Sequence, residues 1–316
     1  MITSIGKDVK LAASLLQAGE LVAIPTETVY GLAGNALNNE AVLRIYDVKQ
    51  RPFFNPLIIH LPDFSSVTRY VTELPPDAVM LSKQFSPGPL SFLLPKSALV
   101  PDLVTAGSDR VVVRIPSHPM ALELLSMLDF PLAAPSANIF GYVSPVSAEH
   151  VMEGLGGKIS YILDGGPCAV GLESTIVGFE DGEIIIHRLG GVTVEDIRRT
   201  TGKDPRLNLL HKRPETPGQL RSHYAPSTRL VVGDVNDLLM ENRDKNIAVI
   251  SFRKNYKGVA RNFVLSPSGN MHEAASNLFS VLREIDNLDV NLILAEKFPE
   301  EGIGRAINDR LSRASS

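Results

Sequence analysis

The sequence predicts an α/β protein, with a twisted, mixed open sheet and flanking helices, followed by a smaller open α/β domain. Short apolar runs typical of buried strands alternate with amphipathic helical stretches along the chain. Strands outnumber helices, and hairpin signals are mixed with crossovers, which favours a mixed sheet over a purely parallel one. A proline-bearing stretch without regular pattern separates residues 1–203 from residues 229–316. We therefore expect two domains joined by a linker at 204–228.

The composition is that of an ordinary globular protein of about two domains. The chain has 316 residues, of which 44% are hydrophobic and 21% charged, and its net charge is −4. This charge argues against a protein that grips nucleic acid over a broad basic face. The single cysteine, Cys168, excludes an internal disulfide and a cysteine-based zinc cage. The N-terminus lacks the apolar core of a signal peptide, and no apolar run reaches the roughly 18 residues of a membrane span, so we expect a cytoplasmic protein.

The first elements include the stretch that we expect to organise the site. Residues 8–18 form an amphipathic helix pattern that Gly19 ends. Residues 21–60 are expected to form a βαβ-like unit, with strands at 21–24 and 57–60 and a helix at 39–48. The segment PTETVYGLAGNA follows the first strand, and its polar groups are more than a core requires. Gly31 and Gly34 would let backbone approach a ligand closely.

The later elements continue the mixed pattern. Further strands are predicted at 90–94, 111–115, 132–134, 159–163, 174–179 and 183–188, and helices at 77–84, 118–128 and 147–153. Asp181-Gly182 predicts a hairpin, and Thr193 with Asp196 resembles a capping box for a helix that ends at Gly202. Beyond the linker, the predicted strands are 229–232, 247–251, 263–265 and 292–295, and the helices 271–285 and 303–312.

No Walker A loop, dinucleotide fingerprint, HExxH pair or GxSxG elbow occurs. Instead, polar or cationic residues recur where predicted strands or helices end, and the set is Thr26, Thr28, Lys49, Arg51, Asn55, His60, Thr105, Arg114, Ser136, Asn138, Ser144, Ser174 and Arg188. Open α/β sheets bind ligands at strand ends, so one crevice is expected to gather them. Its four cations would suit phosphates and carboxylates.

Each of these residues also has a structural interpretation. Lys49 and Arg51 would complement a helix C-terminus from solvent, and His60 would be a satisfied structural histidine. Ser136 and Asn138 would be turn formers. Taken singly, most of these residues favour the structural interpretation.

Taken together, the motifs change this balance. PTETVYGL, KQRPFFNPLIIH, SPGPLSF, RVVVRIPSHP, PLAAPSAN, ILDGG and ESTIV occur in order over about residues 20–190. They resemble the threonylcarbamoyl-AMP synthase family, and TPGQLRSHYAP (216–226) and EEGIGRAINDRLSRA (300–314) extend the resemblance. The resemblance implies a YrdC-like catalytic domain at 1–203, a linker at 204–228 that is a possible lid, and a small Rossmann-like domain at 229–316. It implies the formation of L-threonylcarbamoyladenylate and pyrophosphate from L-threonine, bicarbonate and ATP. The product would feed the transferase machinery that makes threonylcarbamoyladenosine in tRNA.

The resemblance also implies roles for residues of this chain. L-threonine would be contacted by Thr26, His60, Arg114 and Ser174, with Arg114 on its carboxylate. ATP would be held by Lys49, Arg51, Asn55, Thr105, Ser136, Asn138, Ser144 and Arg188. His223 and Tyr224, in the linker, would fold back over the nucleotide site, and Mg²⁺ would accompany ATP. Tyr30 would shape the wall near the threonine pocket.

Some alternatives stay open at this point. Adenylation mainly needs two aligned and neutralised anions, so no covalent nucleophile is assigned, and Glu27 and His60 are candidates for the base that deprotonates threonine. The linker could be a gate or a plain tether. The whole protein could instead be an RNA-binding module without adenylation activity, or a related carbamoyl-adenylate enzyme of metallocentre assembly. Arg305, Arg310 and Arg313, near the C-terminus, could form a solvated face, a docking surface or a nucleotide contact.

Overall fold

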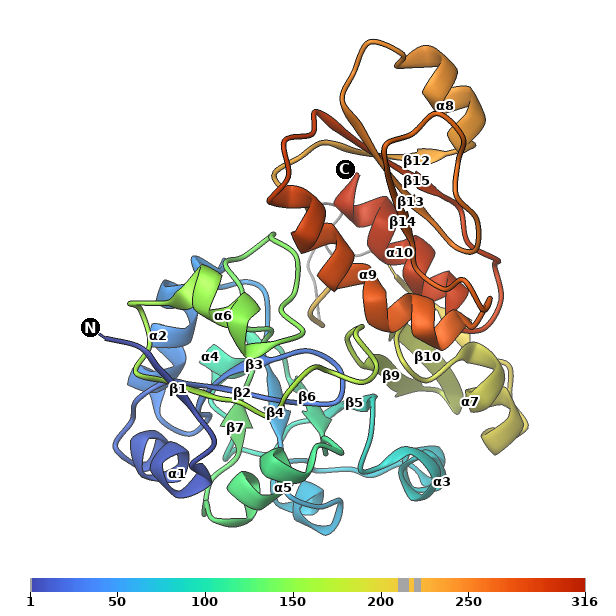
Figure 1. Cartoon of the computed structure of the whole chain (residues 1–316). Coiled ribbons are helices and arrows are strands. Elements are labelled where there is room, and N and C mark those ends of the chain that lie inside the picture. Colours follow the sequence, from blue (N-terminus) through green and yellow to red (C-terminus); the bar gives the residue numbers. More distant parts are fainter. Residues whose placement is uncertain (1, 210–215, 219–222, 316) are drawn as a thin grey trace.

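The computed structural model describes residues 2–209, 216–218 and 223–315. It confirms the predicted fold class, because a large mixed sheet with flanking helices is followed by a smaller parallel sheet with its own helices (Figure 1). Several basic residues of the predicted linker, Lys212, Arg213 and Arg221, lie outside the described residues. Across the described ranges, no helix is both long and apolar enough to cross a membrane.

The large sheet has, among the described residues, eleven strands in the order β1-β8-β2-β3-β7-β4-β6-β5-β9-β10-β11. The strands are β1 (Ser4–Gly6), β2 (Val22–Ile24), β3 (Gly31–Asn35), β4 (Ile58–His60), β5 (Leu90–Pro95), β6 (Arg110–Arg114), β7 (Leu132–Ala133), β8 (Tyr161–Leu163), β9 (Thr175–Glu180), β10 (Glu183–Arg188) and β11 (Arg206–Leu207). The sheet contains both parallel and antiparallel pairs, as the mixed pattern of hairpins and crossovers predicts. The start of the predicted linker thus adds β11 to the sheet, parallel to β10.

Helices cover both faces of this sheet. They are α1 (Val9–Gln17), α2 (Asn39–Lys49), η1 (Ser65–Arg69), α3 (Pro76–Phe85), α4 (Asp102–Thr105), α5 (Pro119–Ser126), α6 (Ala148–Leu155) and α7 (Val194–Thr201). Successive residues of a strand point to opposite faces, so Val22 and Ile24 belong to the cluster with α1 and α5. Ala23 belongs to the other cluster, which includes α2 and α6. The continuous apolar run at 21–24 is therefore explained by a strand that is buried on both sides.

The predicted βαβ-like unit at 21–60 is wrong in one respect. Residues of PTETVYGLAGNA form β3, which pairs antiparallel with β2 on one side and with β7 on the other. Strands β2 and β4 are therefore not neighbours. Gly34 serves packing, because a Cβ there would lie 2.8 Å from the Leu21 side chain, whereas Gly31 lines the cavity described below. Only one of the two glycines thus has the expected position next to a possible ligand.

Local signals placed the other elements well. The capping box of Thr193 and Asp196 is present at the start of α7. The hairpin of β9 and β10 turns at Asp181 and Gly182, which both have positive φ. The pattern did not reveal β1, α4, η1 or, in the second domain, α8, which are all short.

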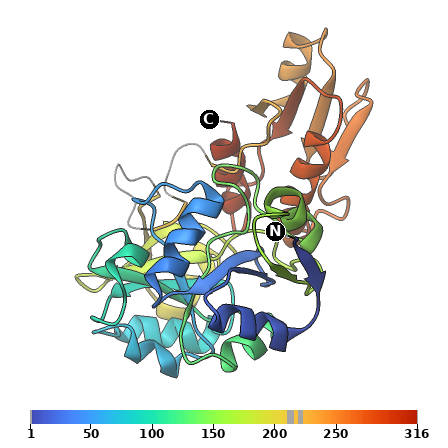
Figure 2. The ribbon, with the colours of Figure 1, turned by 90° about the vertical axis from the view of Figure 1, so that its left-hand side faces the viewer.

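The second domain is an open parallel sheet in the order β12-β15-β13-β14. Its elements are β12 (Leu230–Gly233), α8 (Val235–Glu241), β13 (Ile247–Ser251), β14 (Arg261–Val264), α9 (Met271–Asp286), β15 (Leu292–Glu296) and α10 (Gly304–Ala314). Helices α9 and α10 lie between this sheet and the larger domain, and α8 lies away from it (Figure 1). The turned view shows the same separation of the orange and red segments from the rest (Figure 2). The second domain therefore meets the first through two helices.

Candidate active site

A cavity of about 50 Å³, which we call the central cavity, gathers many of the residues singled out by the sequence. The sheet domain and the linker both line it. The lining residues are Thr26, Thr28, Val29, Gly31, Arg51, Ile58, His60, Arg114, Ala134, Pro135, Ser136, Glu173, Arg188, Pro217, Gly218, His223 and Tyr224. Eight of the predicted site residues are thus brought together across about 200 residues of sequence.

The prediction that the site lies at strand ends is confirmed only in part. His60, Arg114 and Arg188 end strands β4, β6 and β10, which run in the same direction and lie in one row of the register. The other lining residues do not all lie at that edge. His60 ends β4 and Ser136 follows β7, but these strands are antiparallel and the register pairs His60 with Leu132 at the start of β7. The carboxyl ends of the two strands therefore lie at opposite edges. The cavity is built also over a face of the sheet, to which Ile58 and His60 both point because they are two residues apart.

Sheet register explains why His60 and Arg114 meet. The two residues are partners in the parallel pairing of β4 and β6, so their side chains emerge side by side. Arg114 is buried and its Nη2 donates to Oε1 of Glu27 at 2.7 Å. The other Glu27 oxygen accepts from the backbone N–H of Ser117 at 3.1 Å. Glu27 therefore holds the guanidinium of Arg114 in place at the cavity wall.

The His60 imidazole is neutral and lacks a partner at one nitrogen. Burial, and then the positive charge of Arg114, lower the pKa of His60 to about 3. Its Nδ1 is buried without a hydrogen-bond partner among the described residues, and the same is true of Nδ1 of His223. A buried polar atom without a partner is rare away from functional sites. Both imidazoles line the cavity, which is what a ligand-binding site would require.

The other two residues predicted for threonine differ in position. Thr26 lines the cavity, and its hydroxyl donates to the carbonyl of Val29 at 2.6 Å. Ser174 lies behind the wall, where its Oγ accepts from Nη2 of Arg188 at 2.9 Å and lies 2.7 Å from Oγ of Ser91. Ser174 therefore orients Arg188 in this conformation.

Two further arginines make the cavity a site for anions. Arg51 and Arg188 both line it, and burial lowers the pKa of each to about 10, so that both stay positively charged at neutral pH. Arg51 is held in place because its Nη2 donates to Oδ1 of Asn55 at 2.7 Å. With Arg114, three guanidinium groups surround one small space, an arrangement suited to phosphate and carboxylate oxygens.

Five of the residues predicted for ATP lie behind the cavity wall rather than on it. These residues are Lys49, Asn55, Thr105, Asn138 and Ser144. Lys49 Nζ donates to the carbonyls of Ser136 and Asn138, and burial lowers its pKa well below the usual value. Asn138 Nδ2 donates to the carbonyl of Tyr142 at 2.9 Å, and the Thr105 hydroxyl donates to that of Ser108 at 2.7 Å. In this conformation Lys49, Asn138 and Thr105 support the backbone of the site.

The described part of the linker closes the cavity. The His223 ring packs edge-on against Tyr224, with centroids 4.1 Å apart, and against Phe140 at 5.5 Å. Gly218 has φ of +91°, and a Cβ there would lie 2.8 Å from Cδ of Arg188. The wall at this point therefore needs glycine, since an L-residue would be strained and would collide.

Sequence reasoning missed Glu173 and misplaced Tyr30. Glu173 lines the cavity, although the sequence singles it out only as part of the ESTIV motif. Tyr30 is fully buried away from the cavity wall, and its hydroxyl donates to the carbonyl of Gly166 and accepts from the N–H of Gly165. The signal for Glu173 in the sequence is its place directly before Ser174, the residue whose hydroxyl was predicted to contact threonine.

The described residues provide no group of three or more His, Cys, Asp or Glu side chains that could hold a metal ion. Glu173, which lines the cavity, and Glu27, which holds Arg114, are each engaged by an arginine. These contacts do not fit a resident metal site. Mg²⁺ is therefore considered only as part of an ATP–Mg²⁺ substrate, whose phosphates supply most of its ligands.

The fold and the central cavity define an enzyme of the YrdC-like α/β class, with a site for anionic small molecules. Residues 14–190 match the Sua5/YciO/YrdC family, described as "Telomere recombination", and residues 192–316 match the "Threonylcarbamoyl-AMP synthase, C-terminal domain". The chain belongs to the threonylcarbamoyl-AMP synthase family.

Relatives match along nearly the whole chain. The threonylcarbamoyl-AMP synthase of Pyrococcus abyssi is 40% identical, over 97% of this chain and 94% of its own. That of Bacillus subtilis is 38% identical, over 96% of this chain and 92% of its own. The crystal structure of P. abyssi Sua5 complexed with L-threonine superposes with a TM-score of 0.92, at 39% identity, and covers 99% of this chain and 97% of that one. Both domains of the chain are therefore shared with these relatives.

Proposed function

We propose that this chain makes L-threonylcarbamoyladenylate from L-threonine, bicarbonate and ATP, with release of pyrophosphate and water. The observation that carries the proposal is the central cavity, where three buried arginines surround two unpartnered imidazole nitrogens. Such a site can align two anionic substrates without a covalent nucleophile. The family membership and the likeness to a structure with bound L-threonine support the same reaction.

The threonine half of the site would be built on Arg114. Its guanidinium would take the substrate carboxylate, while Glu27 keeps it oriented from the other side. The neutral imidazole of His60 would offer Nδ1 to the substrate hydroxyl or amine, and Thr26 a hydroxyl. Hydroxyl recognition of this kind would reject amino acids that leave a buried polar atom unpaired.

The nucleotide half would be built on Arg51 and Arg188. Their charges would neutralise the phosphates while the α-phosphoryl group passes to the carbamate oxygen, and pyrophosphate leaves. Lys49, Thr105 and Asn138 would keep the surrounding backbone in position through their hydrogen bonds to carbonyl oxygens. Asn55 and Ser144 would hold the side chains of Arg51 and Glu173. Rate would come from alignment and charge neutralisation.

Of the two candidates for the base, His60 is poorly suited. A pKa of about 3 means that the His60 imidazole is a weak base. It would therefore have little tendency to accept the proton of the threonine amine at neutral pH. Glu27 remains as the candidate base, although its carboxylate is shared with Arg114 and the N–H of Ser117.

We also infer that the linker must move for ATP to enter. The central cavity of about 50 Å³ has room for only a few water molecules, whereas pockets for ligands of nucleotide size are several hundred Å³. Pro217, Gly218, His223 and Tyr224 occupy part of the space that ATP would need. A linker that returns over the bound nucleotide would exclude water from the adenylate.

The direct test is an incubation with ATP, Mg²⁺, bicarbonate and labelled L-threonine. We expect pyrophosphate release that depends on threonine and a labelled adenylate as product. Pyrophosphate release that is indifferent to threonine would contradict the proposal. RNA affinity that falls steeply with salt, without pyrophosphate release, would instead favour the RNA-binding module. We further propose that the product passes to a threonylcarbamoyl transferase acting on tRNA, and that the reaction takes place in the cytoplasm.

A further inference from the structure

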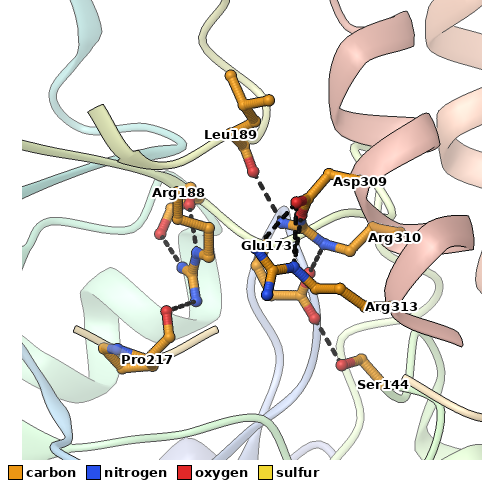
Figure 3. A network of polar contacts seen from close by, with 9 residues as sticks. Ser144, Glu173, Arg188, Leu189, Pro217, Asp309, Arg310 and Arg313 are labelled. Atoms are coloured by element: carbon orange, nitrogen blue, oxygen red, sulfur yellow. Dashed lines mark hydrogen bonds and ion pairs between the residues drawn. The ribbon is translucent and has the colours of Figure 1, made fainter. Parts of the chain in front are cut away.

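One side chain of the second domain reaches the wall of the central cavity. Arg310, on α10, has no exposed surface at all. Figure 3 shows it pointing from that helix toward Glu173, between Leu189 and Ser144. Its Nε donates to Oε2 of Glu173 at 2.8 Å, and its Nη2 donates to the carbonyl of Leu189 at 2.8 Å. Arg310 thus belongs to the second domain in sequence and to the site in space.

The groups that Arg310 contacts are parts or neighbours of the site. Glu173 lines the cavity, and its other oxygen accepts from the Ser144 hydroxyl at 2.6 Å. The guanidinium also lies over the ring of Tyr224, 5.0 Å from its centroid, and Tyr224 lines the cavity from the linker. Leu189 directly follows Arg188. A single guanidinium therefore connects the sheet domain, the linker and the second domain.

Charge is the reason that this contact matters for a nucleotide. Glu173 is a buried carboxylate in a cavity that would receive a triphosphate, and an unpaired negative charge there would repel it. Burial alone would raise the pKa of Glu173, but Arg310 and then Arg188 outweigh it and lower the pKa, so that the group stays ionised. Because Arg310 neutralises the charge of Glu173, Arg188 does not have to pair with Glu173 and remains available to a bound phosphate.

Arg310 is itself held in a fixed position. Its Nη1 donates to Oδ2 of Asp309 at 2.7 Å, and Asp309 also accepts from Nε of Arg313. Figure 3 shows the two arginines on the same side of Asp309. A guanidinium with a hydrogen-bond partner at each of its three nitrogens is oriented more rigidly than an exposed one. The position of Glu173 then follows from the position of α10.

We propose that Arg310 is a positioning residue for ATP, which neutralises Glu173 and keeps Arg188 and Tyr224 available to the nucleotide. The inference rests on the proposed function and adds a role for the second domain. Arg310 does not touch the reacting atoms, so its effect is transmitted through Glu173 and Tyr224. For Arg310, this role would replace the alternatives that the sequence leaves open, which are a solvated face, a docking surface and a direct nucleotide contact.

A matched control separates this role from simple domain docking. Arg283, on α9, is also buried and also joins the two domains. Its Nη2 donates to the carbonyl of Val143 at 2.6 Å, and its guanidinium lies 4.9 Å from the ring centroid of Tyr142. Neither of these partners lines the central cavity. Arg283→Met would therefore weaken docking without removing the counter-charge of Glu173.

The experiment measures ATP–Mg²⁺ binding by calorimetry, threonine-dependent pyrophosphate release, and thermal unfolding, for the full chain and its variants. Arg310→Met is expected to weaken ATP binding at least about tenfold, with a smaller change in the KM for threonine. Arg283→Met is expected to lower the melting temperature but to keep ATP binding within about twofold. Adding Glu173→Gln to Arg310→Met should recover most of the lost ATP affinity, because it removes the charge that Arg310 had balanced. Arg310→Lys, which keeps the charge, should lose less affinity than Arg310→Met.

The outcomes are distinct. Equal ATP binding in Arg310→Met and Arg283→Met, or no recovery on adding Glu173→Gln, would overturn the inference and leave the proposed function standing. A wild-type chain that binds ATP but releases no pyrophosphate with threonine would overturn the proposed function. The ATP affinities of the variants would still test the role of Arg310. If Arg310→Met does not fold, the ATP affinities of Arg310→Lys and Glu173→Gln are measured instead and compared with that of the wild type. Wild-type affinity in both variants would overturn the inference.

Discussion

The buried imidazole of His60 should make the stability of the sheet domain depend on pH. Its pKa is lowered to about 3 in the folded chain, mainly by burial, against a usual value of about 6.5 in an unfolded chain. As the pH falls, the unfolded chain takes up a proton on this residue before the folded chain does. Stability contributed by the neutral imidazole is therefore lost as the pH falls from about 6.5 toward 3.

The magnitude follows from the two pKa values. One residue with this shift should reduce the free energy of unfolding by about 2 kcal/mol between pH 7 and pH 5, and by about 4 kcal/mol between pH 7 and pH 3. The pKa of His223 is also lowered by burial, so it adds a change of the same sign. Since carboxylates titrate in the same range, the informative quantity is the difference between the wild-type chain and His60→Asn.

The assay is urea unfolding at several pH values between 7 and 5. The free energy of unfolding should fall less steeply with decreasing pH in His60→Asn than in the wild type, by about 1 kcal/mol per pH unit. His272→Asn serves as the control because His272 is exposed on α9, and we expect it to keep the wild-type slope. If the free energy of unfolding depends on pH in the same way in the wild type and in His60→Asn, His60 is not a buried neutral imidazole. It would then again be a candidate for the base that deprotonates threonine.

Three further predictions concern the walls of the central cavity. Arg114→Ala should lower kcat/KM for threonine by about 30-fold or more, because it removes the partner of the threonine carboxylate and leaves the buried carboxylate of Glu27 unpaired. An unchanged kcat/KM would contradict the role assigned to Arg114. His223→Ala combined with Tyr224→Ala should reduce adenylate formation or increase its hydrolysis, as measured by labelled product against pyrophosphate, and wild-type kinetics would show that the linker is a plain tether. Gly218→Ala should cost about 1–2 kcal/mol of stability in thermal unfolding, because its φ is +91° and the new Cβ would meet Arg188, whereas an unaffected melting temperature would mean that this segment relaxes freely.

Much of the fold was predictable because its signals are local. The helix at 39–49 begins at an asparagine cap, and the hairpin of β9 and β10 turns at Asp181 and Gly182. Strand β3 was missed because its sequence, GLAGN, has neither alternation nor β-branched residues. It is a strand because β2 and β7 pair with it from both sides, and pairing between distant segments is not encoded in the local pattern.

The candidate site was predicted in its membership more than in its arrangement. The resemblance brought His60, Arg114 and Arg188 to attention, and the structure places all three on one cavity. It did not separate residues that line the cavity from those behind it, such as Lys49, whose ammonium group is used by two backbone carbonyls. Whether a side chain faces a ligand or supports a wall depends on its neighbours in space.

The sequence by itself determined the fold class, the two-domain organisation that we expected, and the residue types that make the site suitable for anions. These properties follow from hydrophobic periodicity, turn residues and charge, which act over a few residues. Only the tertiary structure decided that the site lies over a sheet face and that Arg310 of the second domain balances Glu173 across 137 residues of sequence. The reason is physical: burial, register and the sign of the neighbouring charge arise only when distant segments pack together.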